Sequence, residues 1–196
     1  MVGGKVQKQQ AVDNGVANVV KAGDEGSAQT ASVLLPAGAL SSSSSSLKLV
    51  NNPAVVPPDA SGVVSIKVVV EISLTAQTAL SNGKTALVTL NYQDANGDGI
   101  VDGTAIRIDR LVMYSAASAA GPWIRDLSST VDRSSKTVTG NTGHFSFFGL
   151  FAPAAATLDG VRVYPNPFMP NGGNSDKGVP YNGSALSGIT FDNLII

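Results

Sequence analysis

Residues 63–74 of the chain are Val63-Val-Ser-Ile-Lys-Val-Val-Val-Glu-Ile-Ser-Leu74. Every even position is apolar, whereas serine, lysine and glutamate fall only at odd positions. Successive side chains of a strand point to opposite faces, so this period of two predicts a long strand with one face in a core. The predicted core face consists of Val64, Ile66, Val68, Val70, Ile72 and Leu74. Lys67 and Glu71 are predicted to be solvated on the other face.

Other segments show the same strand character at short intervals. Ala31–Ala39 reads as a strand that ends in a turn at Pro36 and Gly38, and the serine run 41–46 reads as a solvated loop. Further strands are predicted at 85–92, 104–114 (with a bulge near Arg110), 123–127, 136–138 and 145–151. No stretch has a helical apolar period. The predicted fold is all-β, an antiparallel β-sandwich with almost no helix.

Composition excludes several classes of function. The chain has 196 residues, a net charge of −1 and no cysteine. A near-neutral chain without a basic run lacks the electrostatic footprint for nucleic acid or anionic lipid. Without cysteine there is no disulfide scaffold, zinc-thiolate centre or thiol nucleophile. No apolar run reaches the ~18 residues of a membrane span, so we expect no membrane insertion.

Two separated motifs carry a first family resemblance. They are Val33-Leu-Leu-Pro-Ala-Gly-Ala-Leu40 and His144-Phe145-Ser146. Together they resemble the β-sandwich domain of ankyrins, netrin receptors and the zonula occludens protein, and its bacterial extracellular relatives. That family has a Pro-x-Gly-Ala turn near its start and a His-Phe-Ser strand near its end. The resemblance implies a sandwich over 24–152, preceded by a linker or approach strand over 1–23.

A second resemblance begins after an Ala/Pro linker, expected at 153–159. Val161-Arg-Val-Tyr-Pro-Asn-Pro-Phe168 resembles the opening strand of the immunoglobulin-like domain related to the flagellar hook-capping protein. The same opening occurs in the sorting domains of type IX secretion cargo. Gly188-Ile-Thr-Phe-Asp-Asn-Leu194 resembles that family's second strand. We expect 160–196 to be the first part of such a unit, and the chain to be part of a longer polypeptide whose other domains are its partners.

The strongest chemical signal is Asp94-Ala-Asn-Gly-Asp-Gly-Ile-Val-Asp102. Calcium takes six to eight oxygen ligands, and this spacing matches positions 1, 3, 5, 7 and 9 of a calcium loop. Asp94, Asn96 and Asp98 are predicted side-chain ligands, Ile100 a carbonyl ligand, and Asp102 a direct or water-mediated ligand. The bidentate glutamate of a full EF-hand is replaced by Ala105, and the flanks resemble strands. The alternative is a metal-free hairpin turn, which Asn-Gly and Asp-Gly favour by themselves.

His144-Phe145-Ser146 is the one constellation that could carry a reaction. In the resembling family some members cut themselves between Phe and Ser: the serine hydroxyl attacks the preceding carbonyl, and histidine moves the proton. Other members keep the fold without cutting. Self-cleavage at Phe145–Ser146 is therefore kept as an alternative to a histidine satisfied at the end of a strand.

Trp123 follows Gly121-Pro122 and offers a further alternative. It could be the stacking platform of a carbohydrate-binding module of a secreted enzyme. Such sites normally use several aromatic rings, so packing of Trp123 against the protein is the favoured interpretation.

The expected function is a non-catalytic extracellular or cell-surface structural or adhesion module with a calcium-stabilised hairpin loop. Its surface location is inferred from the resemblances, since the first ten residues contain no hydrophobic signal segment. A cell-surface or glycan partner would fit this role.

Overall fold

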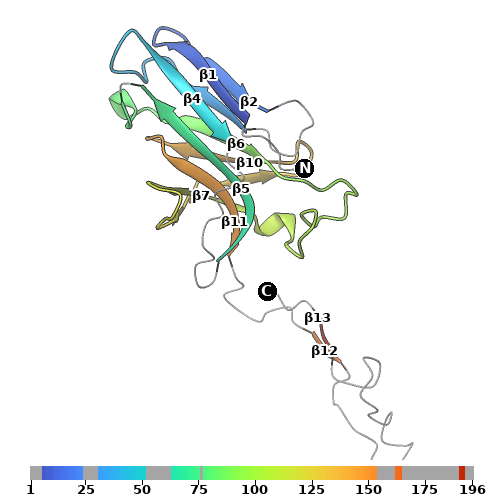
Figure 1. Ribbon diagram of the computed structural model, residues 1–196. Coiled ribbons are helices and arrows are strands. Elements are labelled where there is room, and N and C mark those ends of the chain that lie inside the picture. Colours follow the sequence, from blue (N-terminus) through green and yellow to red (C-terminus); the bar gives the residue numbers. More distant parts are fainter. Residues whose placement is uncertain are drawn as a thin grey trace, which may run out of the picture. The chain divides into compact units, whose positions relative to one another are not determined.

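The computed structural model describes residues 6–23, 31–51, 63–75, 77–153, 162–164 and 190–192 (Figure 1). The chain divides into two compact units, Met1–Pro153 and Ala154–Ile196. The first unit therefore ends one residue beyond the expected end of the sandwich.

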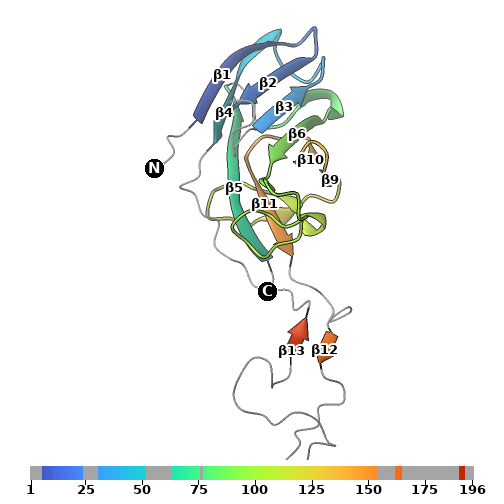
Figure 2. The ribbon, with the colours of Figure 1, turned by 90° about the vertical axis from the view of Figure 1, so that its right-hand side faces the viewer.

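The first unit consists of two antiparallel sheets packed face to face (Figure 2). The six-stranded sheet has the order β1 (Val6–Asp13), β4 (Ser44–Asn51), β5 (Val63–Leu74), β11 (Phe147–Pro153), β7 (Val112–Ala116), β8 (Ile124–Arg125). The five-stranded sheet has the order β2 (Asn18–Ala22), β3 (Ala31–Leu35), β6 (Ala86–Asn91), β10 (Thr137–Thr142), β9 (Thr130–Asp132). Two single-turn 3₁₀ helices, η1 (Ser81–Gly83) and η2 (Ile108–Arg110), are the helical elements of the described residues. The prediction of an antiparallel β-sandwich with almost no helix is confirmed.

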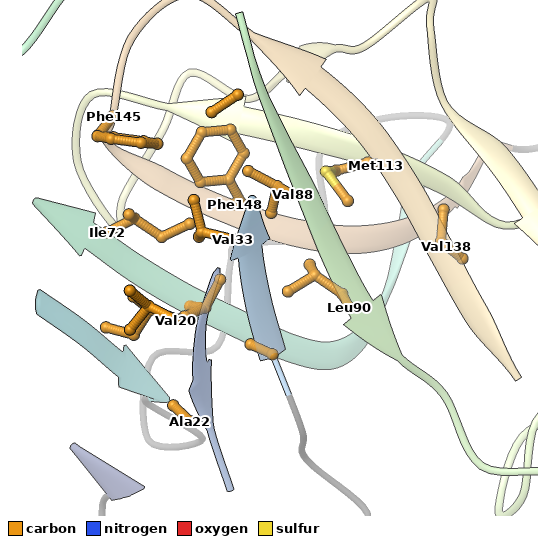
Figure 3. Packing of buried hydrophobic residues seen from close by; sticks show 14 of the residues in the cluster. Val20, Ala22, Val33, Ile72, Val88, Leu90, Met113, Val138, Phe145 and Phe148 are labelled. Atoms are coloured by element: carbon orange, nitrogen blue, oxygen red, sulfur yellow. The ribbon is translucent and has the colours of Figure 1, made fainter. Parts of the chain in front are cut away.

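The core fills the space between the sheets with alternating side chains of both. Fully buried apolar residues from the two sheets point toward one another (Figure 3). They include Val20, Val33, Leu35, Leu47, Leu49, Ile72, Val88, Leu90, Met113, Val138 and Leu150. Each such side chain stabilises the fold by about 1.5–3 kcal/mol relative to its exposed state. This apolar contact between the sheets fixes which face of each strand turns to solvent.

Strand β5 keeps the predicted alternation only in its second half. Val70, Ile72 and Leu74 are buried, whereas Val64, Ile66 and Val68 are partly buried against the core. A β-bulge separates the halves: Gly149 of β11 pairs with Val69, but Phe151 pairs with Ser65. Three residues of β5 therefore lie opposite one of β11, and Lys67 among them has a φ of 62°. A bulge bends and twists its strand, which accounts for the curvature of β5 in Figure 2.

The sequence analysis underestimated how many strands residues 1–23 contribute. Residues 1–23 were expected to form at most an approach strand, yet they contribute β1 and β2, one strand to each sheet. The prediction of a loop over the serine run 41–46 was also wrong in part. Ser44–Ser46 pair with Asp13–Ala11 and form the start of β4. Serine hydroxyls cannot fill a core, but backbone pairing with an edge strand does not require apolar side chains.

The predicted strand 104–114 was wrong in its first half. Ile106, Ile108 and Leu111 are buried as a strand would bury them. However, the chain turns at η2 before Val112 begins β7. Apolar residues at this spacing fit a 3₁₀ turn against the core as well as a bulged strand, so the pattern alone was ambiguous.

The second unit contains one described strand pair. β12 (Arg162–Tyr164) pairs antiparallel with β13 (Thr190–Asp192), and Val163 lies opposite Phe191. These strands fall within the two segments that the sequence assigned to a first and a second strand. The linker expected at 153–159 lies outside the described residues apart from Pro153, the last residue of β11.

Candidate cation-binding loop

The predicted calcium loop connects β6 to η2 and is anchored at both ends. At its start, Tyr92 is buried and donates its backbone N–H to the carbonyl of Lys136 over 3.0 Å. At its end, Val101 is buried and donates to the carbonyl of Ile106 over 2.8 Å. Asp102 N–H also returns to the carbonyl of Gln93 over 2.9 Å. The sandwich therefore holds the loop at its base.

Three of the predicted ligands gather around one backbone N–H. Asp94 Oδ1 and Asn96 Oδ1 accept from Asp98 N at 3.1 and 3.2 Å. Asn96 Nδ2 in turn donates to Asp98 Oδ2 over 2.8 Å. Gly97 and Gly99 have φ of 72° and 83°, a left-handed backbone that glycine adopts without strain and that closes this tight turn. The structure thus brings Asp94, Asn96 and Asp98 together.

The two remaining predicted ligands, Ile100 and Asp102, make other hydrogen bonds within the loop. Asp102 accepts from Ala95 N with both carboxylate oxygens, at 3.2 and 3.0 Å. Ile100 donates its N–H to Asp98 Oδ1 over 2.8 Å and forms a β-bridge with Arg107. Asp102 is therefore not gathered around the Asp98 N–H with the first three ligands.

The donor set fits calcium in chemistry but is not arranged as a closed cage. All the predicted donors are oxygen atoms, which a hard cation requires. Among the described residues, no three acidic or histidine side chains form a group able to hold a metal ion as they stand. The loop carboxylates accept backbone N–H groups instead, so binding would require Asp94 and Asp98 to exchange those hydrogen bonds for the ion.

The electrostatics of the loop are acidic. Burial raises the pKa of the Tyr92 phenol, and the negative charge of Asp94 raises it further. Close by, Arg133 and Arg107 flank Asp109, and the hydrogen bond from Arg107 lowers the pKa of that carboxyl. This outer group contains its own ion pairs, whereas none of the ion pairs in the described part of the chain includes a loop carboxylate.

One contact of the loop was not anticipated from the sequence. Lys136, in the turn between β9 and β10, donates from Nζ to the backbone oxygen of Asp94 over 2.5 Å. The two residues are 42 positions apart, so no local pattern could indicate the contact. Only the adjacency of β6 and β10 in one sheet brings them together.

The second predicted site, His144-Phe145-Ser146, lies between β10 and β11, where His144 forms an isolated β-bridge with Ala79 and Ser146 lies in a bend. Ser146 O accepts from Ile72 N over 2.9 Å, and Phe145 N donates to Thr78 O over 2.8 Å. His144 is exposed, and its Nδ1 lies 3.5 Å from Thr142 Oγ1. Ser146 Oγ is directed to the carbonyl of Phe147, the residue after it. No hydrogen bond joins His144 to Ser146 in the described part of the chain.

Trp123 packs on the outer face of the six-stranded sheet. Its ring centroid lies 5.0 Å from that of Phe151, which in turn lies 4.9 Å from Tyr114. Gly149 lies beneath, where a Cβ would come within 3.3 Å of the indole. The indole Nε1 is buried and has no hydrogen-bond partner among the described residues. These contacts agree with the interpretation of Trp123 as a packing residue.

Comparisons with known proteins add no family. No family model matches this chain, and a comparison with curated proteins found no match. The two resemblances therefore rest on their motifs alone. No helix of the described residues is long and apolar enough to cross a membrane.

Proposed function

We propose that this protein is a non-catalytic structural or adhesion module of the cell surface or extracellular space, in which a calcium ion stiffens the loop 94–102. The observation that carries the proposal is the convergence of Asp94 Oδ1 and Asn96 Oδ1 on the Asp98 N–H. Two oxygens of the expected ligand set already lie side by side on a loop whose base is held by buried residues. An ion bound there would cross-link the loop and would carry out no chemistry.

The affinity expected of this loop suits an extracellular role. The twelfth position, which supplies a bidentate glutamate in a full EF-hand loop, is Ala105. Loops with fewer charged ligands bind calcium with Kd values on the order of 10⁻⁴–10⁻³ M, as extracellular modules do. The motifs that resemble secreted bacterial domains point to the same setting. Within it, the partners we propose are other domains of the same polypeptide.

Thermal unfolding with calcium and with chelator tests the proposal. At 10 mM calcium, a Kd of 10⁻⁴–10⁻³ M stabilises the folded state by about 1.4–2.7 kcal/mol, a rise in Tm of about 3–10 °C for a domain of this size. Asp98→Asn keeps an oxygen that can accept from Ile100 but loses the charge, so its Tm should rise by clearly less.

The matched control is Asp126→Asn. Asp126 also accepts hydrogen bonds in a turn, from Ser128, but lies outside the loop. This variant should keep the full calcium response. An unchanged Tm of the unmodified protein between chelator and 10 mM calcium would contradict the calcium assignment.

A further inference from the structure

The contact of Lys136 with the loop invites a role that the metal motif does not include. Asp94, Asp98 and Asp102 place three negative charges within nine residues, and Asp94 is only 7% exposed. The ammonium of Lys136 reaches the loop from the turn between β9 and β10. It lies 2.5 Å from the backbone carbonyl oxygen of Asp94 and forms no ion pair with a loop carboxylate in the described part of the chain. A cationic group is thus already seated at the base of the loop, supplied by the protein itself.

Lys136 is attached to the loop base through both its backbone and its side chain. Its backbone carbonyl accepts from Tyr92 N over 3.0 Å, and its ammonium donates to the backbone oxygen of Asp94, two residues after Tyr92. It does so with a φ of 54°, a backbone conformation that residues with a Cβ rarely adopt. The turn from Asp132 to Lys136 is fixed by Asp132, which accepts from Ser134 and Ser135. The backbone from which the Lys136 side chain extends is therefore held by hydrogen bonds within the turn.

We propose that Lys136 is a tethered counter-ion of the loop, one that holds Asp94 in the absence of calcium and lowers the affinity for calcium when the ion arrives. This inference rests on the proposed function, since it assigns the regulation of the same site. Tyr92, whose N–H bonds to Lys136, lies near the charges of Asp94, Asp132 and Arg133, and Arg133 in turn contacts Asp109 of the Arg107–Asp109 pair. Of the cationic side chains that the structure describes, that of Lys136 is the one with a hydrogen bond to the loop.

Coulomb's law gives the size of the effect. If the ammonium lies about 7 Å from the bound divalent ion, a water-like dielectric of ~80 gives about sevenfold weaker binding, and 0.1 M salt reduces this to about threefold. Removal of the charge should therefore tighten calcium binding by about three- to sevenfold. The gain should shrink as ionic strength rises, which a purely structural role of Lys136 would not produce.

Isothermal titration of the full chain with calcium chloride tests the inference. Lys136→Met keeps the aliphatic stem and removes the charge, and we expect it to bind three- to sevenfold more tightly than the unmodified protein. Lys136→Arg keeps the charge and should bind with unchanged affinity. Lys67→Met is the matched control, because Lys67 also has a positive φ but is exposed, with no hydrogen bond or ion pair of its ammonium among the described residues.

The outcomes separate the inference from the function on which it rests. If the unmodified protein binds calcium and Lys136→Met binds equally or more weakly, the counter-ion role is overturned while the calcium site stands. If neither protein binds calcium, the calcium assignment fails and the inference falls with it. Circular dichroism checks that each variant is folded, and Lys136→Gln, with the same expected gain, replaces Lys136→Met should that variant unfold.

Discussion

The aromatic cluster on the outer face of the six-stranded sheet should behave as a second, smaller core. Phe151 is 1% exposed and lies between Tyr114 and Trp123. Truncation of a buried phenylalanine to alanine costs about 3–5 kcal/mol, and each aromatic pair adds about 0.5–1.5 kcal/mol beyond its buried area. The two lost aromatic contacts increase this cost, whereas Trp123, which is partly exposed, can relax into the cavity and reduce it. We therefore expect Phe151→Ala to lower the free energy of unfolding by about 4 kcal/mol, the middle of the range for a buried phenylalanine.

Urea unfolding followed by tryptophan fluorescence measures this loss directly. Trp123 is the single tryptophan of the chain and contacts the ring that is removed, so the probe reports on the cluster itself. Leu127→Ala serves as the control, since Leu127 is 90% exposed and its truncation should change stability by less than about 0.5 kcal/mol. Phe151→Leu should fall between the two.

A small effect of Phe151→Ala would contradict the packing role of this ring. A loss below about 1 kcal/mol for Phe151→Ala is the size expected of an ordinary surface contact rather than of a buried ring. An unchanged fluorescence emission maximum in the folded variant would show that the environment of Trp123 does not depend on Phe151. Either result would leave the outer face of β11 without the packing role assigned here.

Three further predictions concern other parts of the first unit. In Gly140→Ala the new Cβ would overlap Asp126 Oδ2 and lie 3.0 Å from Met113 Sδ, so urea unfolding should show a loss of about 1–3 kcal/mol. Hydrogen bonds from two serines lower the pKa of Asp132 to about 2, so the stability that this carboxylate contributes is present above pH ~4 and lost as the pH falls toward 2; an NMR titration midpoint near 4 would contradict this. Mass spectrometry should find an intact chain of 19.9 kDa, because Ser146 Oγ faces the carbonyl after it, and fragments split at Phe145–Ser146 would overturn that reasoning.

The sequence indicated the sandwich wherever a strand buries one whole face. β6 shows this best, because alternate residues of Ala86–Asn91 are buried as its pattern predicts. β1 was foreseen only as an approach strand or a linker within 1–23, for the opposite reason. It is an edge strand whose described side chains are mostly exposed, with Val12 buried, so its sequence carries almost no alternation. Its strand identity comes from backbone pairing with β4, which no local pattern of residues can show.

In the candidate site, too, local contacts could be predicted from the sequence, whereas contacts between distant segments could not. The spacing of Asp94, Asn96 and Asp98 was sufficient to predict that their side chains gather, because a tight turn acts over a few residues. Lys136 could not be found in this way, since its contact depends on the register between β6 and β10. Asp102 shows a further limit: its spacing fits a ligand, but in the structure its carboxylate is engaged by Ala95 N.

An NMR titration of the backbone amides with calcium can follow the loop residue by residue. The N–H groups of Ala95, Asp98 and Ile100 now donate to the carboxylate and amide oxygens that would have to turn to the ion. Their resonances should move progressively and saturate with a midpoint between about 0.1 and 1 mM calcium. The amide of Lys84, before the opposite end of β6, should stay in place. Loop amides that do not move at 10 mM calcium would contradict the central claim that this loop is a calcium site.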